Sequence, residues 1–438
     1  MAVSTTKINA LSLFKLKVLS IFLSLLIGFF LVGCSENEDD EGEYKYDGGA
    51  KYSISFFDSN LDIINSVKES GNVNITAIAK ELGINGAIYA ASGKPVVLGS
   101  YDLTEDVNFY TIGNVKEVST QEDLHNVRGD LSGKYVLVQD IELDASGAGF
   151  DGANGWNPLS TFTGIFNGNF HKITNLWIER TTNQIGLFGV VDNAQIKNLG
   201  VEIAEGKEAK GEDYVGGIAG HIEGSSSIVN SYVAGDVRGD NAVGGIAGRL
   251  TDTVSIKNSY SMGNIRGSQR VGGIAGLLLQ TASIRNSYST ADVSGTNNYV
   301  GGIVGGADDS GNFVRYSYSS GNVNGASSVG GIAGWNAANV SNNAAINPSV
   351  VGTGNNRKNR IAGSSSGTAS DNIARNALSS DFSDFVDGNK YSGTGKDDGA
   401  FFLQSTYENL GWVFGESNDA PWKIDEGESL PYFYWQKL

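Results

Sequence analysis

The chain has 438 residues, with 31 Lys and Arg against 48 Asp and Glu and a net charge of −17. This balance argues against nucleic acid as a partner, because a basic surface supplies most of the affinity for phosphate backbones. The single Cys excludes an intrachain disulfide, and the three His are too far apart in sequence for an HExxH zinc site. Gly is abundant at 60 residues and Pro scarce at 5, so the composition is not collagen-like or proline-rich.

Residues 1–33 have the pattern of a secretory signal peptide. Three Lys precede an apolar run over residues 18–32, which is short compared with the roughly 20 residues of a membrane-spanning helix. The run ends in Leu31-Val32-Gly33-Cys34, which resembles the lipobox of bacterial lipoproteins. This resemblance implies cleavage before Cys34 and lipidation of Cys34 with acyl chains such as palmitate. The alternative is an anchor helix with an incidental Cys.

Residues 34–44 form an acidic tether. Six of the nine residues from Ser35 to Glu43 are acidic, so this run repels itself and stays solvated. The run resembles the acidic export tag of surface-exposed lipoproteins in some Gram-negative bacteria. That resemblance implies an outer-membrane lipoprotein displayed at the cell surface and bound to the membrane through Cys34. A periplasm-facing lipoprotein is the alternative.

Residues 45–115 are predicted to form a small α/β N-terminal domain of unassigned fold. Apolar patterning predicts its helices over 56–66 and 75–82 and its strands over 87–89, 95–98 and 107–112.

The middle of the chain repeats. The phrase Val-Gly-Gly-Ile begins at residues 215, 243, 271, 300 and 329, and a worn copy occupies 360–363. Between these copies recur Ile-x-Asn-Ser-Tyr and Gly-[Asp/Asn]-Val-x-Gly, so each unit of 28 or 29 residues contains three short apolar segments. Such segments are too short for helices and are typical of strands separated by tight turns.

These repeats predict an all-β fold, a parallel β-helix (solenoid) in which each repeat is one coil and coils lie about 4.8 Å apart. The predicted solenoid spans 116–378, with core repeats over 215–363, and its glycines are expected at corners that need a positive φ. Thr120-Gln121-Glu122-Asp123 has the form of a capping box. We expect the short helix that it opens to cover the first coil.

The repeated phrases resemble the GLUG motif, and their flanks resemble the segments that surround GLUG repeats. The resemblance covers roughly residues 117–438 and includes a C-terminal capping segment over 379–438. It implies a right-handed β-helix on secreted or surface proteins of bacteria, often adhesin-like. Some GLUG repeats occur in IgA-cleaving metallopeptidases, but this chain has no HExxH motif.

A tyrosine column is the first candidate binding site, and its members are Tyr232, Tyr260, Tyr288 and Tyr318. Facing outward, the column forms an aromatic strip that stacks on sugar rings or another ligand. Facing inward, it is a core stack. Strand alternation places Ile228, Asn230 and Tyr232 on one side, which favours the core position.

Two polar columns have structural and functional interpretations. Asn230, Asn258 and Asn286 are expected to bond to one another and to turn backbone, although a ligand row is the alternative. Asp236 and Asp292 alternate with Asn264 and Asn322, a row whose oxygens suit Ca²⁺. A solvated turn is the default, because no D-x-D-x-D-G loop is present.

We expect non-catalytic adhesion or binding of a host or cell-surface glycan or protein, with no catalytic residue and no cofactor assigned. One alternative is a carbohydrate-active β-helix enzyme, a polysaccharide lyase or glycoside hydrolase. Its acids would come from the loop insertions at 144–156 and 388–400, which contain Asp151 and Asp397. A structural component of the cell envelope is the third interpretation, since the fold does not determine function.

Overall fold

The computed structural model describes residues 52–84, 88–90, 100–103, 106–353, 358–376 and 391–437, which belong to one compact unit. The predicted signal peptide, Cys34, the acidic tether and the predicted strand over 95–98 lie outside these residues.

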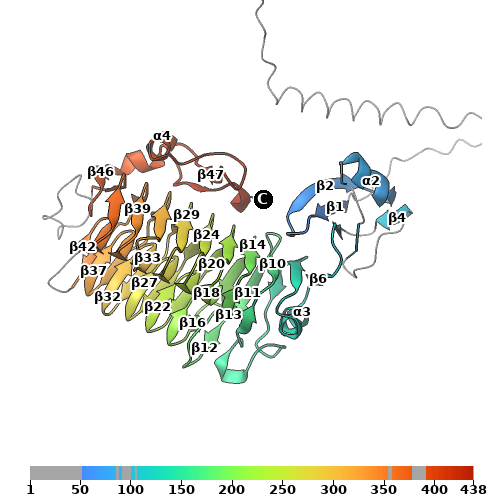
Figure 1. Cartoon of the computed structure of the whole chain (residues 1–438), viewed down its shortest axis with the longest axis horizontal. Coiled ribbons are helices and arrows are strands. Elements are labelled where there is room, and N and C mark those ends of the chain that lie inside the picture. Colours follow the sequence, from blue (N-terminus) through green and yellow to red (C-terminus); the bar gives the residue numbers. More distant parts are fainter. Residues whose placement is uncertain are drawn as a thin grey trace, which may run out of the picture. The chain divides into compact units, whose positions relative to one another are not determined.

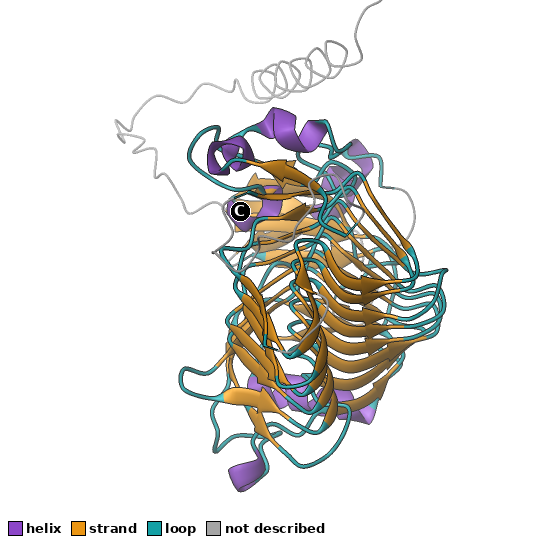
Figure 2. Cartoon of the chain, turned by 90° about the vertical axis from the view of Figure 1, so that its left-hand side faces the viewer, coloured by secondary structure: helices purple, strands orange, loops and turns teal. Residues whose placement is uncertain are grey.

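Most of the described chain is a parallel β-solenoid, as the repeat spacing predicts (Figures 1 and 2). Equivalent strands of successive coils pair in register, so that Ile228 lies opposite Ile256 and Val243 opposite Val271. A typical coil contains the strands Ala219–Glu223 (β18), Ser227–Val229 (β19), Tyr232–Ala234 (β20), Asp236–Arg238 (β21) and Asn241–Gly244 (β22).

The coil therefore has five strands where the sequence predicted three. Two of the predicted segments bend at corners and divide. Val-Gly-Gly-Ile crosses the corner between β22 and Ala247–Leu250 (β23), and Ile-x-Asn-Ser-Tyr bends at its Asn, where Asn230 has a φ of 50°.

Stacking of the coils produces five parallel sheets. We call two of them the ladder sheet, which contains β19, and the tyrosine sheet, which contains β20. The ladder sheet has ten strands and runs from Val115–Val118 (β6) to Thr368–Ser370 (β44), and the tyrosine sheet has ten strands and runs from Ile141–Glu142 (β8) to Thr394–Lys396 (β46). The other three sheets have eight, seven and six strands. They run from Leu159–Phe162 (β9) to Ala362–Ser365 (β43), from Ile178–Glu179 (β12) to Val350–Gly352 (β41), and from Asp213–Val215 (β17) to Lys358–Asn359 (β42). The solenoid thus extends to Lys396, past the predicted boundary at residue 378.

The interior of the coils is a continuous apolar core. Ile196, Ile228, Ile256 and Ile284 stack as one fully buried column of the ladder sheet. Burial of each such side chain contributes about 1.5–3 kcal/mol to folding. The first coils are filled instead by the bulkier rings of Trp156, Phe162, Phe166 and Phe188.

The paired glycines of Val-Gly-Gly-Ile are required by close backbone approach. A Cβ on Gly245 would lie 2.3 Å from the carbonyl oxygen of Gly273 in the next coil, and one on Gly273 would lie 2.2 Å from the oxygen of Gly302. The expected positive φ falls elsewhere in these corners, on residues such as Ala242 (52°) and Arg270 (54°). At this corner the reason for glycine is steric contact between coils, whereas Gly235 and Gly263 have the predicted positive φ, at 125° and 111°.

The asparagine column forms the predicted ladder of side-chain amides, at the corner between the ladder sheet and the tyrosine sheet. Asn198 donates to Asn167, Asn230 to Asn198, Asn258 to Asn230 and Asn286 to Asn258, with N···O distances of 3.0–3.3 Å. Residues 198, 230, 258 and 286 all have a φ near 50°, a conformation that Asn tolerates better than most residues. The structural interpretation of this column is confirmed.

The predicted helix at the first coil is present as Gln121–Asn126 (α3), followed by Val127–Gly129 (η1). Thr120 and Asp123 form the expected capping box, in which each side chain accepts the other residue's backbone N–H. Leu124 and Val127 are fully buried in the solenoid core, so the helix covers the end of the first coil.

The N-terminal domain contains Tyr52–Phe57 (β1), Ile63–Glu69 (β2) and Val107–Tyr110 (β5) in one sheet, a pair formed by Gly71–Asn74 (β3) and Ser100–Leu103 (β4), and the helix Ile75–Glu81 (α2). The helix predicted over 75–82 is confirmed. The helix predicted over 56–66 is wrong. The Asp58 carboxylate accepts the backbone N–H groups of Asn60 and Asp62 and forms a turn between β1 and β2.

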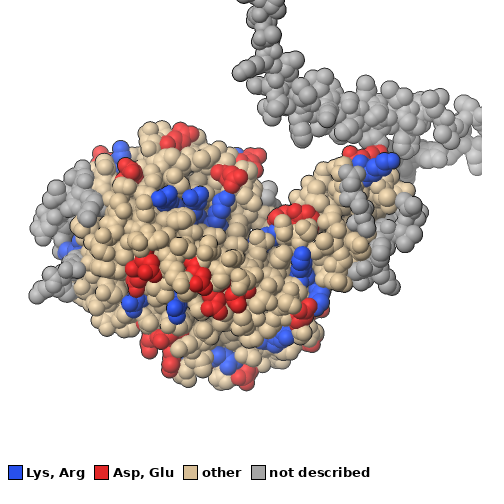
Figure 3. Space-filling model, in the orientation of Figure 1, with Lys and Arg blue, Asp and Glu red and all other residues tan. Residues whose placement is uncertain are grey.

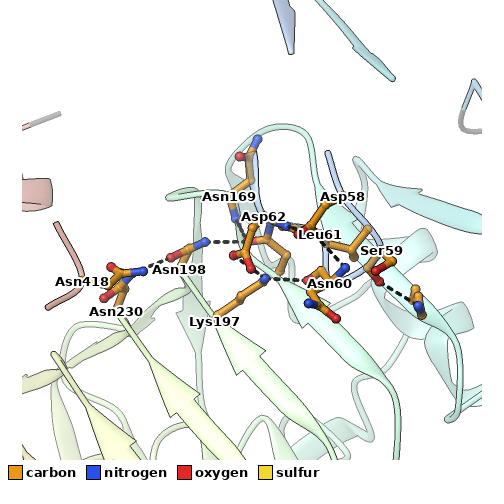
Figure 4. Close-up of polar contacts among 12 residues, drawn as sticks. Asp58, Ser59, Asn60, Leu61, Asp62, Asn169, Lys197, Asn198, Asn230 and Asn418 are labelled. Atoms are coloured by element: carbon orange, nitrogen blue, oxygen red, sulfur yellow. Dashed lines mark hydrogen bonds and ion pairs between the residues drawn. The ribbon is translucent and has the colours of Figure 1, made fainter. Parts of the chain in front are cut away.

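That turn is bonded to the side of the solenoid (Figure 4). The Lys197 ammonium lies 2.6 Å from the Asp62 carboxylate and donates to the Asn60 carbonyl at 2.5 Å. Asn167, the first residue of the ladder, donates to the Leu61 carbonyl at 2.6 Å. The side chain of Lys197 is only 5% exposed, whereas that of Asp62 is 56% exposed, so the buried ammonium meets a carboxylate that remains in contact with water.

The C-terminal segment, which we define as residues 398–437, does not continue the stack of coils. It contains Asp398–Phe402 (η4), Gln404–Glu408 (α4), Trp422–Lys423 (β47), Tyr432–Phe433 (β48) and Tyr434–Lys437 (η5). It folds back along the outer face of the tyrosine sheet and bonds to the ladder, since the Asn418 side chain accepts from Asn230 and its carbonyl accepts from Asn258.

Replacement of Asn258 separates the two contributions of the ladder to stability. We expect Asn258→Gly, which keeps the left-handed backbone but loses the amide bonds, to lower the free energy of unfolding by about 2 kcal/mol. Asn258→Ala adds left-handed strain and is expected to cost about 1 kcal/mol more. Urea denaturation followed by circular dichroism measures both, with the exposed Asn297→Ala as control. Equal stability of the three variants would contradict a stabilising ladder.

Candidate functional site

The tyrosine column lies on the outer face of the tyrosine sheet. Its members occupy β20, Tyr260–Met262 (β25), Tyr288–Ser289 (β30) and Tyr318–Ser319 (β35). Neighbouring rings stack with centroids 5.0, 4.8 and 4.8 Å apart and interplanar angles of 5° or less. The column is therefore a regular aromatic stack, repeated at the coil spacing.

The C-terminal segment covers this stack. Trp412, Trp422, Phe433 and Trp435 pack on its rings, and Tyr260, Tyr288 and Tyr318 are only 7%, 5% and 3% exposed. The hydroxyl of Tyr318 donates to the Pro431 carbonyl at 2.8 Å. The proposal of an open, ligand-facing column is thus corrected, because the chain's own C-terminus occupies it and leaves only Tyr232 partly exposed.

Strand alternation is interrupted at the corner asparagine, so the side predicted for Tyr232 is wrong. Ile228 points into the core, but the left-handed backbone at Asn230 ends β19 and starts a new strand at Tyr232. Alternation therefore restarts after the corner, and Tyr232 lies outside the coil rather than on the side of Ile228. The column is buried, as the core interpretation expected, but between the sheet and the C-terminal segment.

The aspartate column is bonded by the chain's own donors. Asp236 accepts from the backbone and side chain of Asn264 and pairs with Arg266 at 3.2 Å, and Asp292 accepts both donors of Asn322 in the same way. No group of three His, Cys, Asp or Glu residues suited to a metal ion occurs in the described ranges. The side chains of this column therefore hydrogen-bond to one another at a turn, in agreement with the structural interpretation.

The acids of the loop insertions also have partners. Asp151 accepts from Asn154 and Arg180, beside the turn Gly152–Asn154 (η2), and Asp397 accepts from Asn376. These carboxylates are separated along the solenoid, in its first and last described coils.

The three histidines do not converge. His171 lies 3.3 Å from Asp140, and His125 lies in α3. His221 is buried against Thr251, and burial together with the nearby Arg249 lowers its pKa to about 4. His221 is therefore neutral at physiological pH.

A shallow groove of about 840 Å³ runs across equivalent corners of successive coils, and we call it the axial groove. Its floor contains Gly239–Asp240, Gly267–Ser268, Gly295–Thr296 and Gly325–Ala326, and Arg238 and Arg266 contribute to its lining. These residues were not among the predicted site residues, although the phrase Gly-[Asp/Asn]-Val-x-Gly ends at this corner in each repeat. Thr296 is exposed, and the groove offers backbone and hydroxyl groups at the coil spacing.

A larger hollow of about 1050 Å³ lies between the N-terminal sheet and the first coils. Its two carboxylates already accept hydrogen bonds. Asp106 bonds to the backbone N–H of Ser53 at 2.7 Å, and Glu117 bonds to the hydroxyl of Tyr110 at 2.8 Å. Both carboxylates in the walls of the hollow therefore stabilise the fold through these hydrogen bonds.

The predicted lipidation site, Cys34, lies outside the described residues. Among those that are described, no helix is long and apolar enough to cross a bilayer.

Alkaline pH is expected to loosen the C-terminal segment. Burial raises the pKa of Tyr260 to about 12 from 10.0. The unfolded chain therefore loses the Tyr260 proton at a lower pH than the folded chain does. The contribution of the neutral Tyr260 to folding stability is complete below pH 10 and is lost as the pH rises toward 12. Tyrosinate absorbance against pH measures this. Trp422→Ala is expected to shift the titration of the column toward pH 10. Trp177→Ala serves as control, because Trp177 lies immediately before β12 and outside the cluster that packs on the column. Equal titration curves would contradict burial by the C-terminal segment.

Comparison with known proteins supports the identity of the repeats. The family model described as "The GLUG motif" matches residues 211–238 and 267–294. Part of the chain is similar to a "Putative Gly-rich membrane protein" of Evansella cellulosilytica, with 43% identity over 91 residues, and to "Halomucin" of Haloquadratum walsbyi, with 33% identity over 116 residues. These alignments cover 19% and 26% of this chain but only 10% and 1% of the two relatives.

A crystal structure of a "putative immunoglobulin A1 protease" from Bacteroides ovatus is similar over 73% of this chain and 92% of that chain. The TM-score is 0.48 and the sequence identity is 22%. The two matched segments each contain the Val-Gly-Gly-Ile corner, the Asn ladder position and one stacked Tyr. Two of the repeats are therefore GLUG motifs, and these repeats are coils of a parallel β-solenoid.

Proposed function

We propose that this chain is a lipid-anchored protein of the bacterial cell surface that binds a glycan polymer along its solenoid without acting on it as an enzyme. The lipobox at Cys34 and the acidic tether after it support the anchored, displayed arrangement. The names of the two relatives, a membrane protein and a halomucin, support a location at a membrane or surface.

The axial groove is the observation that carries the binding proposal. Its glycines, Gly239, Gly267, Gly295 and Gly325, recur about every 4.8 Å along it, and Ser268, Ser294, Thr296 and Asn324 add hydroxyl and amide groups beside them. A linear polymer presents equivalent groups at regular intervals and matches such a row better than a compact small molecule does. Hydroxyl and backbone groups are suited to the hydroxyls of a glycan.

The state of the carboxylates supports a non-catalytic role. Glycoside hydrolysis needs two carboxyl groups facing one substrate, and a lyase needs a base beside a neutralised uronate. In the described part of the groove, Arg238 and Arg266 pair with Glu208, and Arg266 also pairs with Asp236. These acids balance neighbouring cations.

Filling the axial groove tests the proposal. On a glycan array, the full chain is expected to bind a restricted set of glycans, and Thr296→Trp is expected to weaken that binding about tenfold or more, because the indole occupies the groove. Thr161→Trp, an exposed residue of β9, serves as the matched control. The array is read with and without Ca²⁺, and bound glycans are then assayed for cleavage.

Selective binding without cleavage, reduced by Thr296→Trp alone, supports the proposal. Cleavage contradicts the non-catalytic role and directs attention to the loop acids. Absence of glycan binding contradicts the proposed function and favours a protein partner or a structural envelope role. Loss of binding on chelation would return the aspartate column to consideration as a metal site.

Replacement of Cys34 tests the anchor. Wild-type cells are expected to incorporate labelled palmitate into the chain and to retain it in the membrane fraction. Cys34→Ala removes the acylated thiol and is expected to abolish the label, whereas Asn37→Ala leaves it unchanged. A label that persists in Cys34→Ala, or is absent from the wild type, would contradict lipidation at this residue.

A further inference from the structure

Arg285 and Arg315 differ from every other arginine in the described ranges. Each of the others has an oxygen partner, for example Asp398 for Arg375, Asp308 for Arg270 and Tyr214 for Arg249. Neither Arg285 nor Arg315 has a described carboxylate within 4.0 Å or a side-chain hydrogen bond, and the Nε of Arg315 is buried without a partner. Two cations thus remain uncompensated in a chain whose net charge is −17.

The two guanidinium groups lie side by side on the outer face of the ladder sheet. Arg285 ends Ser283–Arg285 (β29) and is in register with Arg315, which ends Phe313–Arg315 (β34). Lys257, at the same position of Ser255–Lys257 (β24), pairs with Asp419 at 2.9 Å. Basic side chains accordingly gather over the strands labelled β24 and β29 in Figure 1, as the same view in Figure 3 shows.

One aromatic ring contacts both cations. The centroid of the Phe313 ring is 5.4 Å from the guanidinium carbon of Arg285 and 5.3 Å from that of Arg315, and the Tyr316 ring is 5.9 Å from Arg285. In the next strand, Asn339–Ser341 (β39), Asn339 lies opposite Phe313 and Ser341 lies opposite Arg315. The side-chain Oδ1 of Asn339 is buried without a hydrogen-bond partner.

Like charges directly opposite each other in neighbouring strands are destabilising, and the rings relieve this repulsion only in part. An anion bound to both guanidinium groups would remove it, since Arg presents a planar fork of donors that matches carboxylate and sulfate oxygens. An aromatic face beside such a fork suits the apolar face of a sugar ring. An acidic peptide would use the charges but not this combination.

We infer that Arg285, Arg315 and Phe313 form a binding site for the acidic units of a glycan, with a uronate carboxylate or a sugar sulfate held between the two guanidinium groups. This inference rests on the proposed function, because it takes the ligand to be a glycan, and it adds the class of glycan and a site on a sheet other than those of the axial groove.

The full chain is tested against immobilised polygalacturonate, which carries carboxylates, heparin, which carries sulfates, and dextran, which is neutral. We expect binding to one or both acidic polymers that weakens as salt is added. Arg285→Gln/Arg315→Gln is expected to reduce it about tenfold or more, because hydrogen bonds to charged groups are the strong ones. Lys210→Gln/Arg375→Gln removes the same charge from two surface ion pairs and is expected to bind as the wild type does.

Phe313→Leu keeps the apolar bulk and is expected to reduce binding less than the double Arg variant does. Circular dichroism of each variant checks that the solenoid is intact. Acidic binding that is unchanged in Arg285→Gln/Arg315→Gln, or reduced equally in the control, would overturn the assignment while leaving glycan binding in place. So would binding of dextran alone. Absence of binding to any glycan, here and on the array, would overturn both proposals.

Discussion

The hydrogen bonds between equivalent backbone groups of successive coils are the interaction on which the rest of the molecule depends. The N–H of Gly217 donates to the carbonyl of Gly245 at 2.9 Å, and Gly245 donates to Gly273 at 3.0 Å. Because this spacing is fixed, any side chain that recurs in the sequence recurs in space at van der Waals or hydrogen-bonding distance. The glycine corners permit the approach, and the Ile, Asn and Tyr columns are its consequences.

The same columns attach the two parts of the chain that do not repeat. The turn between β1 and β2 bonds to Asn167 and Lys197 at one end of the ladder, and the C-terminal segment bonds to Asn230 and Asn258 and packs on the stacked tyrosines. The turn between β1 and β2 and the C-terminal segment thus cover different parts of the repeated surface. What remains uncovered includes the axial groove and the outer face of the ladder sheet around Phe313.

Much of this fold was predictable from the sequence, because the 28- and 29-residue spacing and the Val-Gly-Gly-Ile and Ile-x-Asn-Ser-Tyr phrases specify stacking. The positions of side chains after corners were not, since a single left-handed Asn230 restarts strand alternation and moves Tyr232 outside the coil. The helix predicted over 56–66 failed because the side chain of Asp58 forms a turn that hydrophobic patterning does not report.

The candidate site was harder to predict than the fold. The axial groove is made of Gly, Ser and Thr corners, which look like ordinary turns in a sequence. Arg285 occupies the variable place of Ile-x-Asn, and Arg315 occupies the equivalent place in the looser copy Val314-Arg315-Tyr316. The repeated cation is a signal that the sequence contains. That these cations could form a binding site follows only from the structure, in which no described carboxylate pairs with them and Phe313 contacts both. Phe313 replaces the Ser found at this place in the preceding repeats.

The cover over the tyrosines also constrains the order in which the protein matures. Coils of a solenoid gain stability from their neighbours and can form one after another as the chain emerges. The rings of Tyr260, Tyr288 and Tyr318, however, are buried only when the C-terminal segment packs on them. The covering residues Trp412, Trp422 and Phe433 come more than ninety residues after Tyr318 in the sequence. Until synthesis reaches the C-terminal segment, the nascent solenoid exposes a flat aromatic face of the kind that promotes self-association. The C-terminal segment therefore covers, within the same chain, an apolar face that the preceding repeats leave exposed.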